Sequence, residues 1–89
     1  MINRNITILN KLGLHARASA KFVSTASKFS SKICVTKDTQ KVNGKSIMGI
    51  MMLGASQYVE LILEIEGPDE QQMEQALITL IDSRFGEND

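Results

Sequence analysis

The residue with the most distinctive chemistry in this chain is His15, the only histidine among 89 residues. It stands where an extended stretch gives way to a helical pattern, and Arg17 follows two residues later. The first amides of a helix have no partner within the helix and carry a partial positive charge, so a helix start binds anions. An imidazole at such a site, next to a guanidinium, indicates a nucleophile that accepts a phosphoryl group.

The predicted anion site combines backbone and side-chain donors. With His15 as the N-cap, the amides of Ala16, Arg17 and Ala18 occupy the first helical positions and lack intrahelical acceptors. The helix start favours the neutral imidazole before transfer and the anionic form after it, and the Arg17 side chain adds a charge-assisted bond. The residues alone do not choose between the two ring nitrogens. The alternative for His15 is a plain capping or surface residue.

Other chemistries lack the residues that they need. A metal site needs more than one histidine and one cysteine, and no nucleophile-elbow motif indicates a Ser–His–acid hydrolase. We therefore expect no metal and no cofactor. The single cysteine, Cys34, cannot form an internal disulfide, and in a predicted strand it is interpreted as an inert structural thiol.

The charges are balanced overall but unevenly distributed. Residues 1–45 hold nine of the ten basic side chains and one acid, whereas residues 46–89 hold nine acids and one base. The basic half contains His15, so an acidic partner surface can be steered toward it, although solvated lysines are the alternative. The near-neutral pI and few aromatic residues exclude nucleic-acid binding as the expected function.

Length and composition predict one globular domain over residues 1–89, with 43% hydrophobic and 22% charged residues. The longest apolar run, residues 47–53, is far shorter than the roughly 20 residues of a membrane span. No secretory signal is visible at the N-terminus. We therefore expect a cytoplasmic protein without membrane insertion, and an accessible His15 favours a monomer.

Hydrophobic periodicity and turn residues predict the element order β-α-β-β-α-β-α. Strands are expected at residues 2–9, 32–37, 40–42 and 58–66, and helices at residues 16–29 and 70–84. The segment 46–53 is ambiguous by periodicity, but Ser46 as an N-cap favours a short helix. Asp69, with Gln72 three residues later, resembles a capping box.

The predicted helices each have one apolar stripe, and the last strand has one acidic face. This pattern favours a two-layer α+β domain whose sheet is exposed on the far side. The expected stripes are Ala16, Ser19, Phe22, Val23, Ala26 and Phe29 in the first long helix, and Met73, Ala76, Leu77, Leu80 and Ile81 in the last.

Two segments of the chain resemble the signatures of a known family. They are Asn10-Lys11-Leu12-Gly13-Leu14-His15-Ala16-Arg17 and Lys45-Ser46-Ile47-Met48-Gly49-Ile50-Met51. Both are similar to the HPr family, the histidine-containing phosphocarriers of the bacterial phosphoenolpyruvate-dependent sugar phosphotransferase system. The resemblance covers essentially the whole chain. It implies an open-faced β-sandwich in which helices cover one face of a four-stranded antiparallel sheet.

The resemblance also implies roles for individual residues. His15 is then the residue that accepts phosphate on Nδ1 from Enzyme I and donates it to IIA components of sugar permeases. Arg17 matches the active-site arginine of the family. Ser46 matches the serine that an HPr kinase/phosphorylase modifies in many relatives. The protein is accordingly expected to be a phosphoryl carrier and not an enzyme.

The apolar run after Ser46 is too long for one short helix to bury fully. We expect Ile47, Met48 and Met51 to face outward as a partner-docking surface, and Ile50 and Leu53 to face inward. Burial of all seven residues is the alternative. A phosphate on Ser46 would gain from the helix dipole, but it would repel an acidic partner at this surface.

One departure from the family pattern is Ala18, where proline is commonest. Alanine is a good helix former, so we expect the helix to start in the same place, with the transfer rate and partner preference left open. Two alternative functions remain. One is a nitrogen-related regulatory phosphocarrier with the same histidine chemistry. The other is a non-relay interaction module that acts through Ser46, Met48 and Met51.

Overall fold

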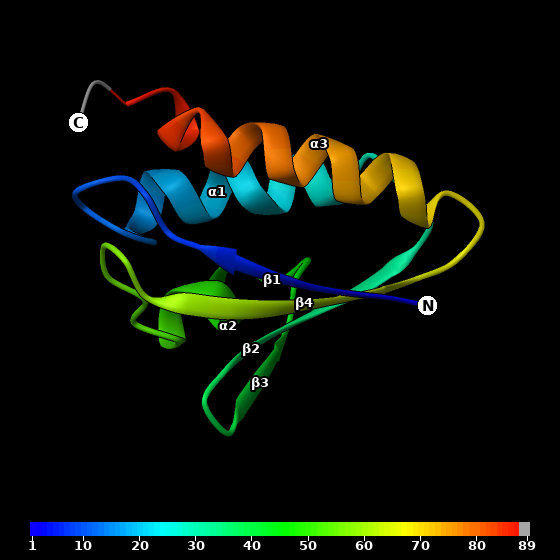
Figure 1. Ribbon diagram of the computed structural model, residues 1–89, viewed down its shortest axis with the longest axis horizontal. Helices are drawn as coiled ribbons and strands as arrows, with labels where there is room; N and C mark the ends of the chain where they lie inside the picture. The colour runs from blue at the N-terminus through cyan, green and yellow to red at the C-terminus, as the bar shows by residue number, and fades with distance from the viewer. Residues whose placement is uncertain (88–89) are drawn as a thin grey trace.

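The computed structural model describes residues 1–87 and arranges them in two layers (Figure 1). Within this range the order is β1 (Ile2–Thr7), α1 (Ala16–Ala26), β2 (Lys32–Lys37), β3 (Gln40–Asn43), α2 (Ile47–Met52), β4 (Glu60–Glu66), α3 (Glu70–Asp82) and the 3-10 turn η1 (Arg84–Gly86). The strands form one antiparallel sheet in the order β1-β4-β2-β3. Buried residues of the helices and of the inner sheet face form one core cluster. The predicted α+β open-faced sandwich is confirmed.

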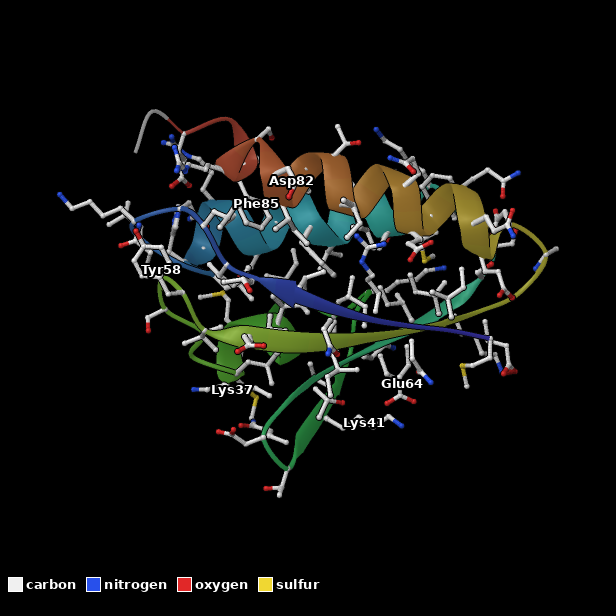
Figure 2. All side chains as sticks on the ribbon, in the orientation of Figure 1. Lys37, Lys41, Tyr58, Glu64, Asp82 and Phe85 are labelled. Carbon is white, nitrogen blue, oxygen red and sulfur yellow. The ribbon has the colours of Figure 1, made fainter. Side chains whose placement is uncertain are left out.

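The central strand β4 shows how the sheet separates a buried face from an open one. Leu61, Leu63 and Ile65 are buried against the helices, as their alternation in the sequence predicts. Glu64 lies on the open face, opposite Cys34 of β2, and pairs with Lys41 of β3 at 3.3 Å (Figure 2). The acidic outer face predicted for this strand is therefore present.

The strands differ from the predicted ranges only at their ends. β1 ends at Thr7 and β4 begins at Glu60, so both strands are shorter than predicted at the ends that pair with each other. The reason is Tyr58, whose φ of 72° lies outside the β region. The Tyr58 amide still donates to the Ile8 carbonyl at 2.7 Å, so pairing continues briefly beyond the strands. β3 runs one residue past its predicted end, to Asn43.

The first long helix ends at Ala26 and not at Phe29 as predicted. The Phe29 amide donates to the Ala26 carbonyl at 3.2 Å, so a single turn follows the helix and Phe29 packs partly against the core. Ser19, Phe22 and Ala26 are buried, as expected of the packing stripe. Ala16 was wrongly assigned to that stripe: it lies in the first turn and is exposed.

Helix α3 begins at Glu70 as predicted, but its capping contact and its end differ from the prediction. Asp69 makes no capping hydrogen bond to α3, so the predicted capping box is wrong. Its carboxylate accepts instead from the amides of Ser30 and Ser31, each at 2.9 Å, and this contact joins α3 to the segment before β2. The Glu70 carboxylate accepts from the amide of Gly67, in the turn before the helix, at 3.1 Å. The helix ends at Asp82, before the predicted boundary.

Candidate functional site

The loop before His15 is held by Asn10, whose side chain is completely buried. The Asn10 Nδ2 donates to the Gly13 carbonyl at 2.8 Å, and the Gly13 amide donates back to the Asn10 carbonyl at 3.1 Å. Gly13 has a φ of 66° and lies so close to the Ala55 carbonyl that a Cβ would overlap it. The conformation of this loop is therefore fixed by contacts on both sides.

His15 is the N-cap of α1, as the sequence predicts. Its backbone is extended, with a φ of −74° and a ψ of −179°, and the first helical hydrogen bond runs from the Ser19 amide to the His15 carbonyl at 2.9 Å. The amides of Ala16, Arg17 and Ala18 precede that bond, so the helix offers them no acceptor. The His15 side chain makes no capping hydrogen bond, which leaves these amides for a ligand.

The imidazole of His15 contacts a carboxylate from the far end of the chain. Its Nε2 lies 2.5 Å from Oε2 of Glu87, and the His15 side chain is 29% exposed. Since an ionised carboxylate only accepts hydrogen bonds, Nε2 must carry the proton. In the neutral ring, Nδ1 then holds the lone pair. The contact thus distinguishes the two ring nitrogens, which the sequence did not.

Glu87 is ionised at this position. Burial acts to raise its pKa, but hydrogen bonds from His15 and Asn10, with the charges of His15 and Lys21, outweigh burial and lower the pKa. The Asn10 Nδ2 reaches Oε1 of Glu87 at 3.1 Å. Sequence reasoning missed both Asn10 and Glu87 as members of this site. Asn10 could have been found from its turn-forming type and its place in the same signature segment as His15, whereas Glu87 has no spacing relation to His15.

Arg17 and His15 line one shallow pocket of about 430 Å³, together with Leu12, Ala16 and Glu87. Arg17 is exposed, and Leu12 is 64% exposed. The structure therefore brings together the predicted nucleophile, the arginine and the helix start. The roles of these residues stay predictions at this point.

The short helix α2 begins after Ser46, whose Oγ accepts from the Gly49 amide at 3.0 Å. The predicted N-cap is therefore present. Ile50 and Leu53 are buried, and the predicted outward set is exposed to solvent: 43% for Ile47, 69% for Met48 and 41% for Met51. Met52, which the prediction did not include, is 65% exposed. The outward surface is thus broader than predicted.

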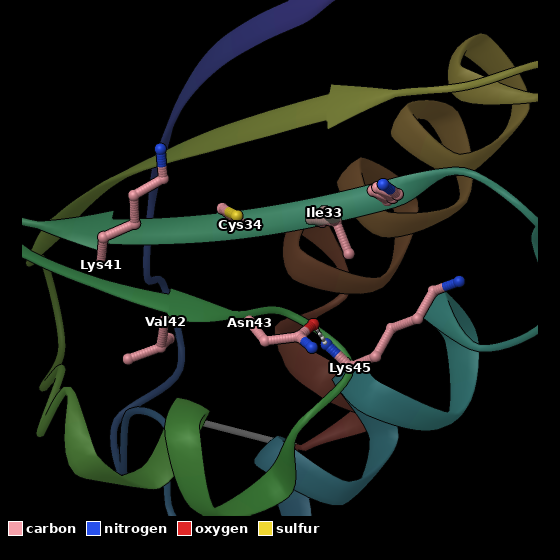
Figure 3. A pocket seen from close by; sticks show the side chains of 7 residues that line it. Ile33, Cys34, Lys41, Val42, Asn43 and Lys45 are labelled. Atoms are coloured by element: carbon pink, nitrogen blue, oxygen red, sulfur yellow. Dashed lines mark hydrogen bonds between the residues drawn. The ribbon is translucent and has the colours of Figure 1, made fainter.

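A second pocket of about 430 Å³ is lined by residues of β2 and β3 and by Lys45, in the loop before α2 (Figure 3). Cys34 lies there as a free, half-buried thiol in β2, where the sequence placed it. Asn43 accepts from the Lys45 amide at 2.9 Å in the same pocket. The pocket shares no lining residue with the pocket at His15. The inertness of Cys34 remains a prediction.

Comparison with known proteins identifies the relatives of this chain. The family described as the PTS HPr component phosphorylation site matches residues 2–83. The phosphocarrier protein HPr of Neisseria meningitidis is 53% identical over 89 residues, which cover all of both chains. A crystal structure of HPr from Thermoanaerobacter tengcongensis has a TM-score of 0.95 and 58% identity, covering 99% of each chain. An HPr dimer from the same organism has a TM-score of 0.76 and 59% identity, covering 98% of this chain and 100% of that one.

The open-faced sandwich and these similarities define the class of the protein as a phosphocarrier of the bacterial sugar phosphotransferase system. The chain belongs to the HPr family. The resemblance predicted from the two signature segments is confirmed. Membership in this family implies a place in a phosphoryl relay.

Proposed function

We propose that His15 carries the phosphoryl group in this chain. It accepts the group on Nδ1 from Enzyme I and passes it to IIA components of sugar permeases. The observation that carries this proposal is the engagement of Nε2 by Glu87, which leaves Nδ1 as the nucleophilic nitrogen at the helix start. As Nδ1 forms a bond to phosphorus, the bond between phosphorus and the donor breaks, and its electron pair leaves with the donor.

The start of α1 stabilises the transferred phosphoryl group. The amides of Ala16, Arg17 and Ala18 have no helical acceptor, so they can donate to phosphate oxygens. The Arg17 guanidinium lines the same pocket and adds a charge-assisted bond. Both contacts strengthen as negative charge builds up at the helix start, so they favour the phosphorylated form.

The protein acts as a carrier and not as an enzyme. His15 is consumed when it accepts phosphate and is regenerated when it gives it away. A ring that is 29% exposed, in a shallow pocket, can be reached by two partners in turn. Each partner supplies its own reacting group, so no small-molecule substrate pocket is required.

The outward side of α2 is the docking surface for these partners. Ile47, Met48 and Met51 form an exposed apolar surface, and methionine adapts its shape to different partners. The Leu14 amide donates to the Ala55 carbonyl at 2.9 Å, which joins the His15 loop to the segment after α2. A partner bound to α2 therefore meets His15 in a fixed place.

Ser46 is a regulatory phosphorylation site for an HPr kinase/phosphorylase. Its Oγ accepts from the Gly49 amide at the start of α2, so a phosphate there stays close to free helix amides. The fold is retained, and the added negative charge acts on partners that dock at Met48 and Met51. Modification therefore lowers the rate of transfer without unfolding the protein.

Residues 1–89 form a single HPr domain that acts as a cytoplasmic monomer. One core cluster unites the described elements, which supports a single domain. Each helix within residues 1–87 is too short or too polar to cross a bilayer. The His15 side chain is 29% exposed and so open to a partner, which supports the monomer. Size-exclusion chromatography at several concentrations tests it, since a dimer peak would refute it.

The experiment that tests the relay uses purified Enzyme I and labelled phosphoenolpyruvate. We expect acid-labile label on the wild-type protein and none on a His15→Ala variant. Label that persists on the variant would remove His15 from the mechanism. Transfer from the labelled protein to a sugar-type IIA should exceed transfer to a nitrogen-type IIA; the reverse order would favour the regulatory carrier.

A further inference from the structure

The contact between His15 and Glu87 belongs to a longer hydrogen-bonded chain. Oε2 of Glu87 meets His15 Nε2 at 2.5 Å, and Oε1 accepts from Asn10 Nδ2 at 3.1 Å. Asn10 is completely buried and its Nδ2 also holds the Gly13 carbonyl. Each oxygen of the carboxylate therefore has a hydrogen-bond partner, and the group cannot rotate away from the ring without losing one of them.

An unusual turn brings Glu87 to this position. Arg84, Phe85 and Gly86 follow one another with φ values of 56°, 56° and 76°, all in the left-handed region. Arg84 and Phe85 are not glycine, so this conformation is uncommon for them. Phe85 is fully buried at the end of α3 (Figure 2), and its carbonyl accepts from Lys21 Nζ at 2.6 Å. Glu87 follows this turn and contacts Asn10, and the uncommon backbone of the turn indicates a functional constraint.

We propose that Glu87 is a positioning residue for phosphoryl transfer, which rests on the proposed role of His15. Its carboxylate holds the proton on Nε2 of the neutral ring, so that the lone pair stays on Nδ1. It also orients the ring toward the amides at the start of α1. Asn10 acts through Glu87 by fixing the second carboxylate oxygen.

The same carboxylate acts on the phosphorylated ring. When Nδ1 binds phosphorus and Nε2 keeps its proton, the ring carries a positive charge that Glu87 balances. A nucleophile on the next partner then bonds to phosphorus while the P–Nδ1 bond breaks. The electron pair of that bond returns to Nδ1, and the ring leaves as neutral imidazole with its Nε2 proton still in place. Without a carboxylate, loss of that proton would leave imidazolate, a much poorer leaving group.

The other charged groups around this contact lie on α1. Lys21 acts on Glu87 through its charge and lies against the Phe85 carbonyl, and Arg17 lines the pocket beside the ring. Lys21 is a cation, so it favours the ionised form of Glu87. Lysine and arginine side chains donate hydrogen bonds and do not accept them, so Glu87 is the acceptor that the ring meets.

The first test measures the tautomer of the unphosphorylated protein by ¹⁵N NMR of the imidazole, well above the pH at which the ring is protonated. In the wild type we expect the proton on Nε2. A Glu87→Gln variant offers one oxygen where Asn10 and His15 each need an acceptor, so the population should move toward the Nδ1–H tautomer. Glu87→Asp keeps two acceptor oxygens and should restore part of the wild-type population.

The control is Glu66→Gln, which removes one exposed carboxylate of β4 on the open face of the sheet. It should leave the tautomer unchanged, which separates the Glu87 effect from a change in net charge. The two-dimensional amide spectrum of each variant reports whether it has folded. A wild-type protein with Nδ1–H, or a Glu87→Gln variant with an unchanged tautomer, would overturn the positioning role.

The second test measures two rates of phosphoryl transfer: to His15 from a small donor, and from His15 to a partner protein. Phosphoramidate, a small phosphoryl donor, should phosphorylate wild-type His15 faster than it does in Glu87→Gln. Transfer from the phosphorylated protein to a IIA acceptor should slow by about tenfold or more in Glu87→Gln, with recovery in Glu87→Asp. Equal rates in both assays would refute the proposal. Failure of Enzyme I to label the wild type, with the Nε2–H tautomer present, would refute the relay alone.

Discussion

The backbone amide of Leu14 donates to the carbonyl oxygen of Ala55 at 2.9 Å, and this bond joins the two ends of the functional surface. Leu14 directly precedes the N-cap of α1, and Ala55 follows α2. Both residues are buried, so water does not compete for the bond. This backbone contact and the glycine beside it therefore help to fix the position of His15 relative to α2.

That glycine gives the first prediction. A Gly13→Ala variant must hold alanine at a φ of 66° and place its Cβ against the Ala55 carbonyl. We expect a loss of about 2 kcal/mol or more in the free energy of unfolding, because left-handed backbone and overpacking both cost energy. Urea unfolding measures the loss. Phosphorylation by Enzyme I should also slow, since the His15 loop separates from α2.

Gly54→Ala is the matched control for this variant. Gly54 has a φ of 60°, but a Cβ there meets no atom within 4 Å. The expected loss is about 1 kcal/mol, from the left-handed backbone alone. Equal losses in the two variants would show that contact with the Ala55 carbonyl adds nothing to the requirement for Gly13.

The second prediction concerns Ser46 as a cap. Ser46→Ala removes the acceptor of the Gly49 amide, which lies 3.0 Å from Oγ. Loss of an N-cap costs about 1 kcal/mol, which corresponds to a fall of about 4–8 °C in Tm for a domain of this size. Differential scanning calorimetry measures it. An unchanged Tm would mean that the hydroxyl contributes no net capping energy.

A negative charge at position 46 should slow phosphoryl transfer while leaving the stability of the fold unchanged. Ser46→Asp keeps an oxygen acceptor and places a negative charge at a helix start, so the Tm should stay close to that of the wild type. Transfer from Enzyme I should slow by about tenfold, because the charge lies beside the exposed Ile47 and Met48 surface. Added salt should restore part of the rate. A normal rate would argue against Ser46 as a control point for docking.

The parts of the site that were predicted correctly depend on short-range signals. A serine before an apolar run predicts the cap of α2, and the alternation along 60–66 predicts the two faces of β4. The position of His15 follows from the change of pattern at residue 16. In each case the residues that decide the local structure lie within a few positions of the feature. A short stretch of sequence is therefore enough to predict it.

The residues that were missed depend on long-range contacts. Glu87 is 72 positions from His15 and 77 from Asn10, and only the packed fold brings them together. The end of α3 is similar: helical periodicity runs on to Arg84, but burial of Phe85 turns the chain into left-handed backbone first. The Asp69 capping pattern failed because the hydroxyl of Ser31, in the segment before β2, donates to the carboxylate. Tertiary packing overrides local pattern at these three places.

A further prediction addresses Ala18, the residue at which this chain departs from the expected family pattern. The Ala18 amide precedes the first helical hydrogen bond, from Ser19 to His15, so proline removes no bond of α1. Phosphorylation of an Ala18→Pro variant by Enzyme I should stay within about tenfold of the wild-type rate, because one potential phosphate donor of several is lost. Stopped transfer, with a wild-type circular dichroism spectrum, would show that the Ala18 amide is indispensable.

The last prediction concerns pH and Asp69. Hydrogen bonds, foremost from the Ser31 hydroxyl and then from the Ser30 amide, lower the pKa of Asp69 below its ordinary value of 3.8. The folded state therefore binds fewer protons than the unfolded state in this range. Asp69 contributes stability above the ordinary value, and the contribution disappears as the pH falls through the lowered one. Asp69→Asn should lower the Tm at neutral pH and should flatten the decline of Tm in acid.

Asp82→Asn, at the other end of α3, is the control for this effect. Its side chain is exposed at the last residue of the helix, far along the chain from the two serines. The variant should keep the acid dependence of the wild type, because the bonds to Ser30 and Ser31 remain. If Asp69→Asn and the wild type lost stability in parallel as the pH fell, the clamp between α3 and the segment before β2 would not depend on the ionised carboxylate.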